Sequence, residues 1–209
     1  MNRIIPIILI MSCINTSYGA LSPSGSPQDQ QIGMIHHKAP VSPNVQPSTK
    51  EFFMEPSIGI TKEHREKVAQ LLNTLLANNF VLYTKLLNYH WNLKSSQFHD
   101  LHAFFKSLYE QQFTIADDLA ERVQTIGFVA LGSLKEFSAH SSLVEQQGSG
   151  LTDQQMLKNL LNDYESLIKI TREYADKTLE YKDIGTNNFL IDLIEKQEKT
   201  SWMIRSSIK

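Results

Sequence analysis

Cysteine is almost absent from this chain of 209 residues, where Cys13 is the only one. Disulfide bonds within one chain and zinc sites built from several thiolates are therefore excluded. No sign of charge dominates either, because 20 Lys and Arg stand against 22 Asp and Glu, and the net charge is −2. We therefore expect no strong nonspecific attraction to nucleic acid or to anionic lipid.

Long apolar runs are also scarce, and the one exception stands at the N-terminus. An Arg precedes the apolar run 4–11, and small residues precede Ala20. This pattern is typical of a cleaved secretory signal peptide, and the run is too short to span a bilayer. We predict that residues 1–19 are a signal peptide and that the protein is periplasmic or secreted, with no stable membrane span. Lipoprotein processing at Cys13 is the alternative, because "IMSC" loosely resembles a lipobox.

Proline is confined to the first part of the chain, since none follows Pro56. Six of the seven prolines lie between residues 20 and 60, among many Ser, Gln and Gly. This composition predicts a flexible arm over 20–60. Lys38 and Lys50 are the only Lys or Arg in the arm, so it cannot act as a polybasic strap on DNA phosphates.

From residue 61 to 209 the apolar residues recur every three or four positions, which indicates amphipathic α-helices. The pattern predicts long helices over 62–93, 97–126, 152–181 and 187–208. Thr152 and Gln155 form a predicted capping box, and Gly127 is expected to end the second helix. The crossover 128–150 has room for one short helix. These features predict an all-α, ferritin-like four-helix bundle over 61–209.

Four polar residues of the first two helices are candidate metal ligands, namely His90, His102, Asp117 and Glu121. Positions 102, 117 and 121 fall within about 100° on the second helix, so they share a face. Along the helix axis, however, His102 lies about 22 Å from Asp117 and about 28 Å from Glu121. These residues cannot bind one ion within a single chain. A two-fold axis across the middle of the second helix would bring residue 102 of one chain toward 117 and 121 of the other.

Imidazole with carboxylate suits Fe(II), Mn(II) or Zn(II). On spacing alone, solvated polar faces of amphipathic helices are the more common explanation for such residues.

The stretches "HWNLKSSQFHDLH", "DDLAERVQTIGFVA" and "EKTSWMIRSS" resemble the Dps family of mini-ferritins, over about residues 62 to 208. The shared pattern is His-Trp, a second His twelve positions after the first, and then D-x-L-A-E-R followed by Gly. The resemblance implies that His90 and His102 of one subunit bind metal with the acids at 117 and 121 of its two-fold partner. These four residues would then be the catalytic and metal-binding residues of a ferroxidase.

The resemblance further implies a shell of twelve subunits that oxidises Fe(II), typically with hydrogen peroxide, and stores ferric iron as protection against oxidative stress. Trp91 stands where the family has an aromatic residue beside the site, and packing at the helix end is the alternative role for it. Ser95 replaces a usual Gly. Lys106 replaces a usual Asp or Glu one turn after His102, and an ammonium cannot ligate a metal and repels a second ion.

Three functions follow from these observations. The first is an exported mini-ferritin with Fe(II) and peroxide as partners. The second is a metal-binding shell whose turnover is weakened by Lys106. The third is DNA protection, which export and the sparse positive charge of the arm disfavour.

Overall fold

The computed structural model describes residues 54–147 and 150–209. The predicted signal peptide and the predicted arm up to residue 53 lie outside the described residues.

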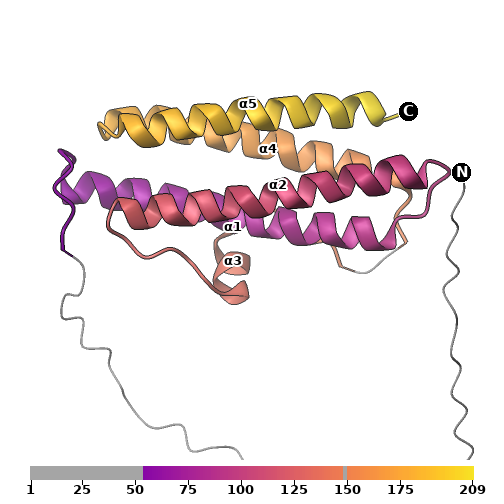
Figure 1. Ribbon diagram of the computed structural model, residues 1–209, viewed down its shortest axis with the longest axis horizontal. Coiled ribbons are helices and arrows are strands. Elements are labelled where there is room, and N and C mark those ends of the chain that lie inside the picture. Colours follow the sequence, from indigo (N-terminus) through magenta and orange to yellow (C-terminus); the bar gives the residue numbers. More distant parts are fainter. Residues whose placement is uncertain (1–53, 148–149) are drawn as a thin grey trace, which may run out of the picture. The chain divides into compact units, whose positions relative to one another are not determined.

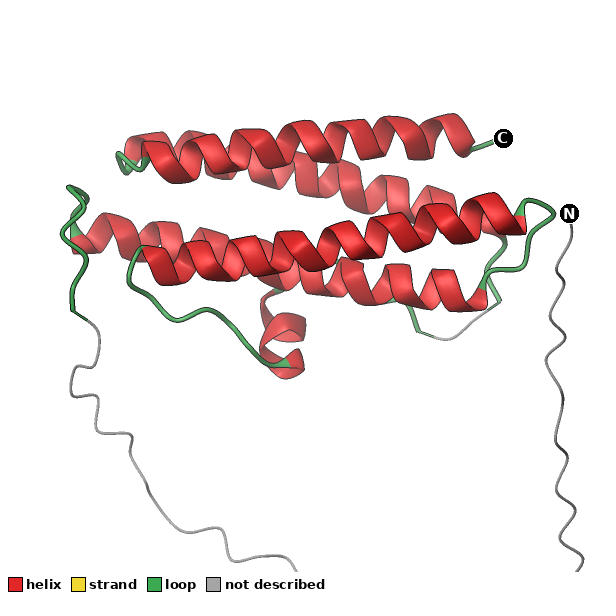
Figure 2. Ribbon diagram, in the orientation of Figure 1, coloured by secondary structure: helices red, strands yellow, loops and turns green. Residues whose placement is uncertain are grey.

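Helices account for all regular secondary structure in the described part of the chain, which contains no strand. The elements are α1 (Lys62–Asn92), α2 (Phe98–Thr125), α3 (Leu134–His140), α4 (Asp153–Glu180) and α5 (Ile184–Ser207). Figures 1 and 2 show the four long helices and the short α3 in the crossover between α2 and α4. The all-α prediction is confirmed, including the short helix in the crossover.

The long helices pack as two pairs. Helix α1 lies along α2, α4 lies along α5, and α1 also packs against α3 and α4 (Figure 1). Each pair is joined by a short turn, whereas the long crossover leads from one pair to the other. This connectivity is the ferritin-like four-helix bundle expected from the sequence.

The predicted signals for helix ends are confirmed where α2 ends and where α4 begins. Thr152 and Gln155 form the reciprocal bonds of a capping box at α4. Gly127 has φ +87°, and the N–H of Phe128 donates to the carbonyl of Val123 at 3.2 Å. This bond is typical of a Schellman motif, which needs a left-handed residue directly after the helix. A Cβ at Gly127 would also lie 2.7 Å from the Pro56 ring, so the position requires glycine on two counts.

The start of α5 corrects one prediction, because the helix begins at Ile184 and not at residue 187, so Gly185 and Thr186 belong to its first turn. The chain reverses instead at Lys182, which has φ 62°. Asp183 then caps α5 by accepting a hydrogen bond from the N–H of Thr186 at 2.9 Å. A left-handed Lys carries no clear sequence signal, since glycine or asparagine is usual in this conformation.

The apolar interior consists of two clusters that follow each other along the bundle. The first gathers buried residues from the N-terminal half of α1 and the C-terminal half of α2, with Leu76, Leu119 and Val123 among them. The second joins the other halves of these helices to the start of α4, with Leu86 and Phe105 among its members. Along α2, the residues that recur every three or four positions from Leu101 to Val123 are buried throughout. On α5, the side chain of Trp202 is exposed, although it lies among apolar residues that recur at helical spacing.

Buried polar side chains connect α1, α2 and α4 across the interior. The Asn79 amide donates to the carbonyl of Gln112 at 2.6 Å, and the Gln112 amide donates to the Tyr164 hydroxyl at 2.8 Å. Burial raises the pKa of Tyr164, which therefore stays a neutral hydroxyl. Asn79 interrupts an apolar stripe in the sequence, and its hydrogen bond offsets the cost of burying it.

A buried ion pair lies in the same interior, between Lys85 of α1 and Asp163 of α4 at 2.6 Å. The two side chains are only 6% and 14% exposed. Burial raises the pKa of Asp163, and the hydrogen bond and charge of Lys85 oppose that rise. This pair could not be predicted from the sequence, because its members are 78 positions apart.

Candidate metal site

His90 and His102 meet at the turn between α1 and α2. Their rings stack with centroids 3.8 Å apart. His90 Nδ1 lies 2.9 Å from the carbonyl oxygen of His102, and His102 Nδ1 lies 3.1 Å from that of His90. A carbonyl oxygen only accepts, so each Nδ1 carries the hydrogen and donates it. The two histidines are thus fixed by reciprocal hydrogen bonds.

These bonds also decide which nitrogen of each ring is available. With Nδ1–H donating, Nε2 carries the lone pair of the neutral imidazole. A metal-binding histidine usually donates its other N–H to a carbonyl or carboxylate, which fixes the ring and its tautomer. Both histidines show this arrangement, which suits coordination of a divalent metal through Nε2.

Aromatic rings hold the histidine pair from both sides. Phe98 stacks on His102 with centroids 4.8 Å apart. Tyr109 contacts His90 edge to face with centroids 5.2 Å apart. His90 is almost fully buried, and His102 is half-buried. The rings therefore have little freedom to rotate away from this geometry.

The substituted turn residue Ser95 also helps to position the pair. Its hydroxyl donates to Asp153 at 2.5 Å and accepts from the N–H of Gln97 at 3.0 Å. The turn that brings the histidines together is thereby joined to the start of α4. A Gly at this position could make neither bond.

The acidic candidates, Asp117 and Glu121, lie near the other end of α2 and are exposed. Within the described residues, neither carboxylate forms a hydrogen bond or an ion pair. Nowhere in the described part of one chain do three or more His, Cys, Asp or Glu side chains form a group that could hold a metal. One chain brings the two histidines together and leaves the two acids apart from them.

Lys106 lies on α2 one turn after His102, as the sequence indicated. Its ammonium is 3.6 Å from Glu110, and both side chains are more than half exposed. An exposed pair of this kind contributes little to stability and does not fix the lysine. Trp91 is 70% exposed, so packing in the interior of one chain does not account for it.

A cluster of exposed and half-buried aromatic rings lies on α1 and α2 between the histidines and the acids. Phe113 is 61% exposed, and its ring centroid is 6.1 Å from that of Tyr83. Tyr83 in turn contacts Tyr109 at 6.3 Å. We refer to Tyr83, Tyr109 and Phe113 as the aromatic face.

This face was not predicted from the sequence, although α2 carries a detectable signal for it. Tyr109, Phe113, Ala116 and Ala120 form a second apolar stripe with the same spacing of three and four as the buried one.

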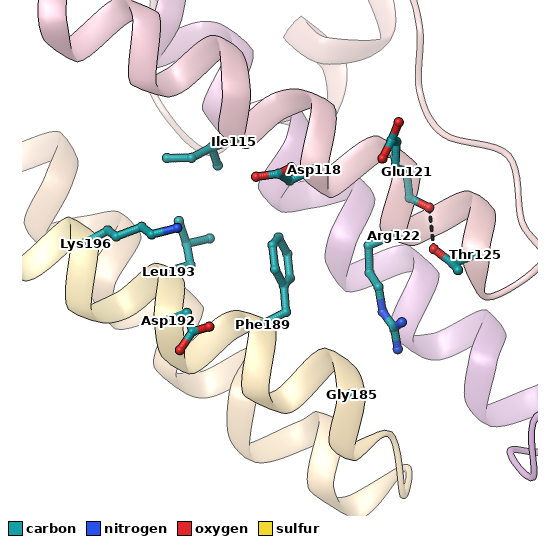
Figure 3. Close-up of a pocket in the computed structure, with 10 residues that line it drawn as sticks. All are labelled: Ile115, Asp118, Glu121, Arg122, Thr125, Gly185, Phe189, Asp192, Leu193 and Lys196. Atoms are coloured by element: carbon teal, nitrogen blue, oxygen red, sulfur yellow. Dashed lines mark hydrogen bonds between the residues drawn. The ribbon is translucent and has the colours of Figure 1, made fainter.

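Of three pockets at the acidic end of α2, two extend to other helices. One of about 390 Å³ lies beside Asp117 and is lined mainly by apolar residues, including Phe80, Phe113, Leu134 and Phe137. The other, of about 380 Å³, lies between α2 and α5 (Figure 3).

The residues around the second pocket carry both signs of charge and do not converge on one ion. Figure 3 shows the carboxylate of Glu121 turned away from α5. Arg122 is already bound to Asp183 at 2.9 Å and to Thr186 at 2.8 Å. Lys196 and Asp192 face the pocket from α5.

No helix in the described ranges combines the length and the apolar character needed to cross a membrane.

Comparison with known proteins finds relatives along most of the chain. Residues 69–209 match the family model described as the ferritin-like domain. An uncharacterized low temperature-induced protein of Nostoc sp. is 38% identical over 73% of this chain and 86% of its own length. DNA protection during starvation protein 2 of Bacillus anthracis is 32% identical over 68% of this chain and 96% of its own length.

Solved structures agree with these relatives. A Dps protein from Vibrio cholerae O1, described as a member of a broad superfamily of ferritin-like diiron-carboxylate proteins, matches with a TM-score of 0.71 and 29% identity. The match covers 76% of this chain and all of that one. DpsC from Streptomyces coelicolor matches with a TM-score of 0.71 and 28% identity, over 74% of this chain and 90% of that one.

Proposed function

Because the chain belongs to the Dps family of ferritin-like proteins, we propose that it oxidises Fe(II) with hydrogen peroxide and stores the ferric product in a hollow shell of its own subunits. The observation that carries this proposal is the pair of reciprocal hydrogen bonds between His90 and His102. They leave two imidazole nitrogens, held by neighbouring rings, that are suited to a borderline metal such as Fe(II).

The remaining ligands come from a second chain in this proposal. Asp117 and Glu121 are about 22 and 28 Å along α2 from His102, so they cannot reach its metal within one chain. Each site then combines the histidines of one chain with Asp117 and Glu121 of the partner subunit. A two-fold axis that creates one such site creates a second, so a dimer has two.

Two surface features support this axis. The midpoints between position 102 and positions 117 and 121 fall at about 110 and 112, where the axis would cross α2. Phe113, exposed in the single chain, lies beside this point. The apolar pocket next to Asp117 offers room for side chains of a second copy. Exposed apolar surface at the expected axis is what a dimer interface requires.

The chemistry of the ligands fits the proposed reaction. Two neutral imidazoles and two carboxylates bring a charge of −2 to the ion, which balances Fe(II) and stabilises Fe(III) more strongly. Oxidation is then favoured because the ligand charge attracts the higher oxidation state more. We place the complete shell at twelve subunits, as in the family that the sequence resembles.

A metal-binding shell with weak turnover is the second candidate, and Lys106 is the observation that favours it. Its ammonium stands one turn from His102 where the family usually has an acid, and its contact with Glu110 is a loose one at 3.6 Å. Repulsion between this charge and a second cation would leave one occupied metal position per site.

Anaerobic loading with Fe(II), followed by peroxide, tests the main proposal and separates the two candidates. Rapid growth of ferric absorbance, with soluble iron retained by a particle of about twelve chain masses, is the expected result. Fe(II) binding without accelerated oxidation would support the weak shell, and absence of Fe(II) binding would refute both.

We also propose that the protein is exported, on the strength of the N-terminal Arg and apolar run. The mass of the protein recovered outside the cytoplasm should correspond to a chain that begins at Ala20 or a close neighbour. Recovery of the full-length chain from the cytoplasm alone would refute export.

A further inference from the structure

We propose that Tyr109 supplies one electron and one proton to the oxidant when a single Fe(II) is oxidised at the histidine pair. This inference rests on the proposed iron oxidation, and it concerns where the second electron for peroxide originates. It makes Tyr109 a relay residue beside the metal site.

The need for such a donor follows from counting electrons. Reduction of one hydrogen peroxide to two waters consumes two electrons, whereas one Fe(II) supplies one. In this inference the site holds one Fe(II) at a time, because the positive charge of Lys106 stands one turn from His102 and would repel a second cation. The second electron then needs another source. With a tyrosine as donor the step balances: Fe(II), TyrOH, H₂O₂ and one proton give Fe(III), a neutral tyrosyl radical and two H₂O.

The position of Tyr109 suits this role. Its ring is in contact with the ring of His90, a proposed ligand of the metal, with centroids 5.2 Å apart. Such contact gives a short path for an electron from the phenol to the imidazole and the bound ion. Tyr83 touches Tyr109 on its other side at 6.3 Å, so the radical has a second phenol with which it can exchange.

Other aromatic residues near the histidines are less suited. Phe98 stacks on His102 but has no hydroxyl to lose a hydrogen atom. The ring of Trp91 makes no aromatic contact with either histidine in the described chain and is largely exposed. The hydroxyl of Tyr89 accepts a hydrogen bond from Asn159 within the interior. Tyr109, in contrast, is half-buried and forms no hydrogen bond among the described residues.

The radical is removed by the next Fe(II) that enters the site. In that step the tyrosyl radical, Fe(II) and one proton give TyrOH and Fe(III). Two Fe(II) are thus oxidised per peroxide, although the site holds only one at a time. Without the tyrosine, Fe(II) and H₂O₂ would give Fe(III), hydroxide and a free hydroxyl radical.

Rapid freeze-quench electron paramagnetic resonance on the full protein tests the inference. The protein is loaded anaerobically with one Fe(II) per chain and mixed with peroxide. We expect a transient tyrosyl signal in the wild type that is narrowed by ring-deuterated tyrosine and reduced at least several-fold in Tyr109→Phe. Tyr174→Phe, which alters a half-buried tyrosine of α4 that packs on the other cluster, is the matched control and should keep the full signal.

Spin trapping gives a second readout that packing alone would not change. Tyr109→Phe keeps the ring but loses the hydroxyl, so it should release several-fold more hydroxyl radical per Fe(III) formed than the wild type or Tyr174→Phe. Ferric iron without a tyrosyl signal, or a signal that survives in Tyr109→Phe and is lost in Trp91→Phe, would overturn this inference and leave the proposed function standing. Failure of the wild type to form ferric iron would overturn both.

Discussion

The interior of the bundle and the outer face of α1 and α2 differ in how their polar groups are satisfied. Apart from Asn78 Nδ2 and Gln197 Oε1, the buried side-chain polar atoms of the described residues have hydrogen-bond partners in the same chain. On the outer face, the carboxylates of Asp117 and Glu121 have no partner among the described residues, and the aromatic Phe113 is exposed. One chain therefore satisfies the polar groups of its core but leaves the proposed ligands of its outer face without partners.

Charges show the same contrast. Lys85 and Asp163 are buried against each other at 2.6 Å, whereas Lys106 and Glu110 are exposed and 3.6 Å apart. A buried pair must stay matched, because a lone buried charge is costly. An exposed lysine can exchange partners at little cost. The interior charges are therefore paired with each other within the chain, whereas those of the outer face are available for a second chain or an ion.

The largest expected effect comes from placing a charge on the aromatic face. Phe113→Glu should prevent pairing of the chains and abolish peroxide-driven iron oxidation, because each proposed site needs ligands from two chains. The helical content of the monomer should persist, since the side chain is exposed. Sedimentation and circular dichroism check both points. Ile191→Glu, on an exposed position of α5, is the control that should keep the dimer. A Phe113→Glu dimer with normal activity would contradict the proposed axis.

Breaking the interior pair should harm the fold and leave the site intact. Asp163→Ala leaves Lys85 buried without a partner and should lower the free energy of unfolding by about 3 kcal/mol. The double variant Lys85→Met with Asp163→Leu should lose much less, because apolar side chains of similar size can replace a buried pair. Urea denaturation measures both values, and iron oxidation per folded chain should stay unchanged. Equal losses in the two variants would show that the ion pair itself is stabilising.

Removing a proposed ligand should impair metal binding and leave the fold intact. Glu121→Ala should weaken Fe(II) binding by about 100-fold, the upper end of what supporting residues of metal sites contribute, with little change in stability. Calorimetric titration under anaerobic conditions measures the affinity.

The neighbouring acid Asp118 is the matched control for a ligand variant, because it is an exposed carboxylate of the same turn of α2 that is not a proposed ligand. Asp118→Ala should bind Fe(II) as the wild type does. Equal losses in Asp118→Ala and Glu121→Ala would indicate general electrostatic attraction rather than coordination.

The smallest effect is expected at Lys106. Lys106→Asp should strengthen binding of a second Fe(II) by about tenfold, because it exchanges a repulsive charge for a potential ligand, and solvent screens much of the gain. The number of Fe(II) bound per site and the rate of peroxide-driven oxidation should both rise. Lys106→Gln separates removal of the charge from addition of a ligand. Unchanged stoichiometry in both variants would show that Lys106 points away from the metal.

Local signals in the sequence are sufficient to predict the helices and most of their ends. Periodic apolar residues, the capping box at Thr152 and the glycine at position 127 act within a few residues of one chain segment, so they can be read locally. The start of α5 was misjudged because a lysine takes the left-handed turn at position 182. The candidate ligands were predicted from a family resemblance, and their spacing already showed that the histidines and the acids lie too far apart for one chain.

Only the tertiary structure decided which groups meet. It paired Lys85 with Asp163 across 78 positions and oriented both imidazoles by reciprocal bonds to each other's backbone. It also left Phe113 exposed and Gln112, one position before it, buried. These outcomes depend on how distant helices are rotated and aligned against each other, which packing of the whole bundle sets. Periodicity indicates that a helix has an apolar face, but it does not identify the side chain that covers that face.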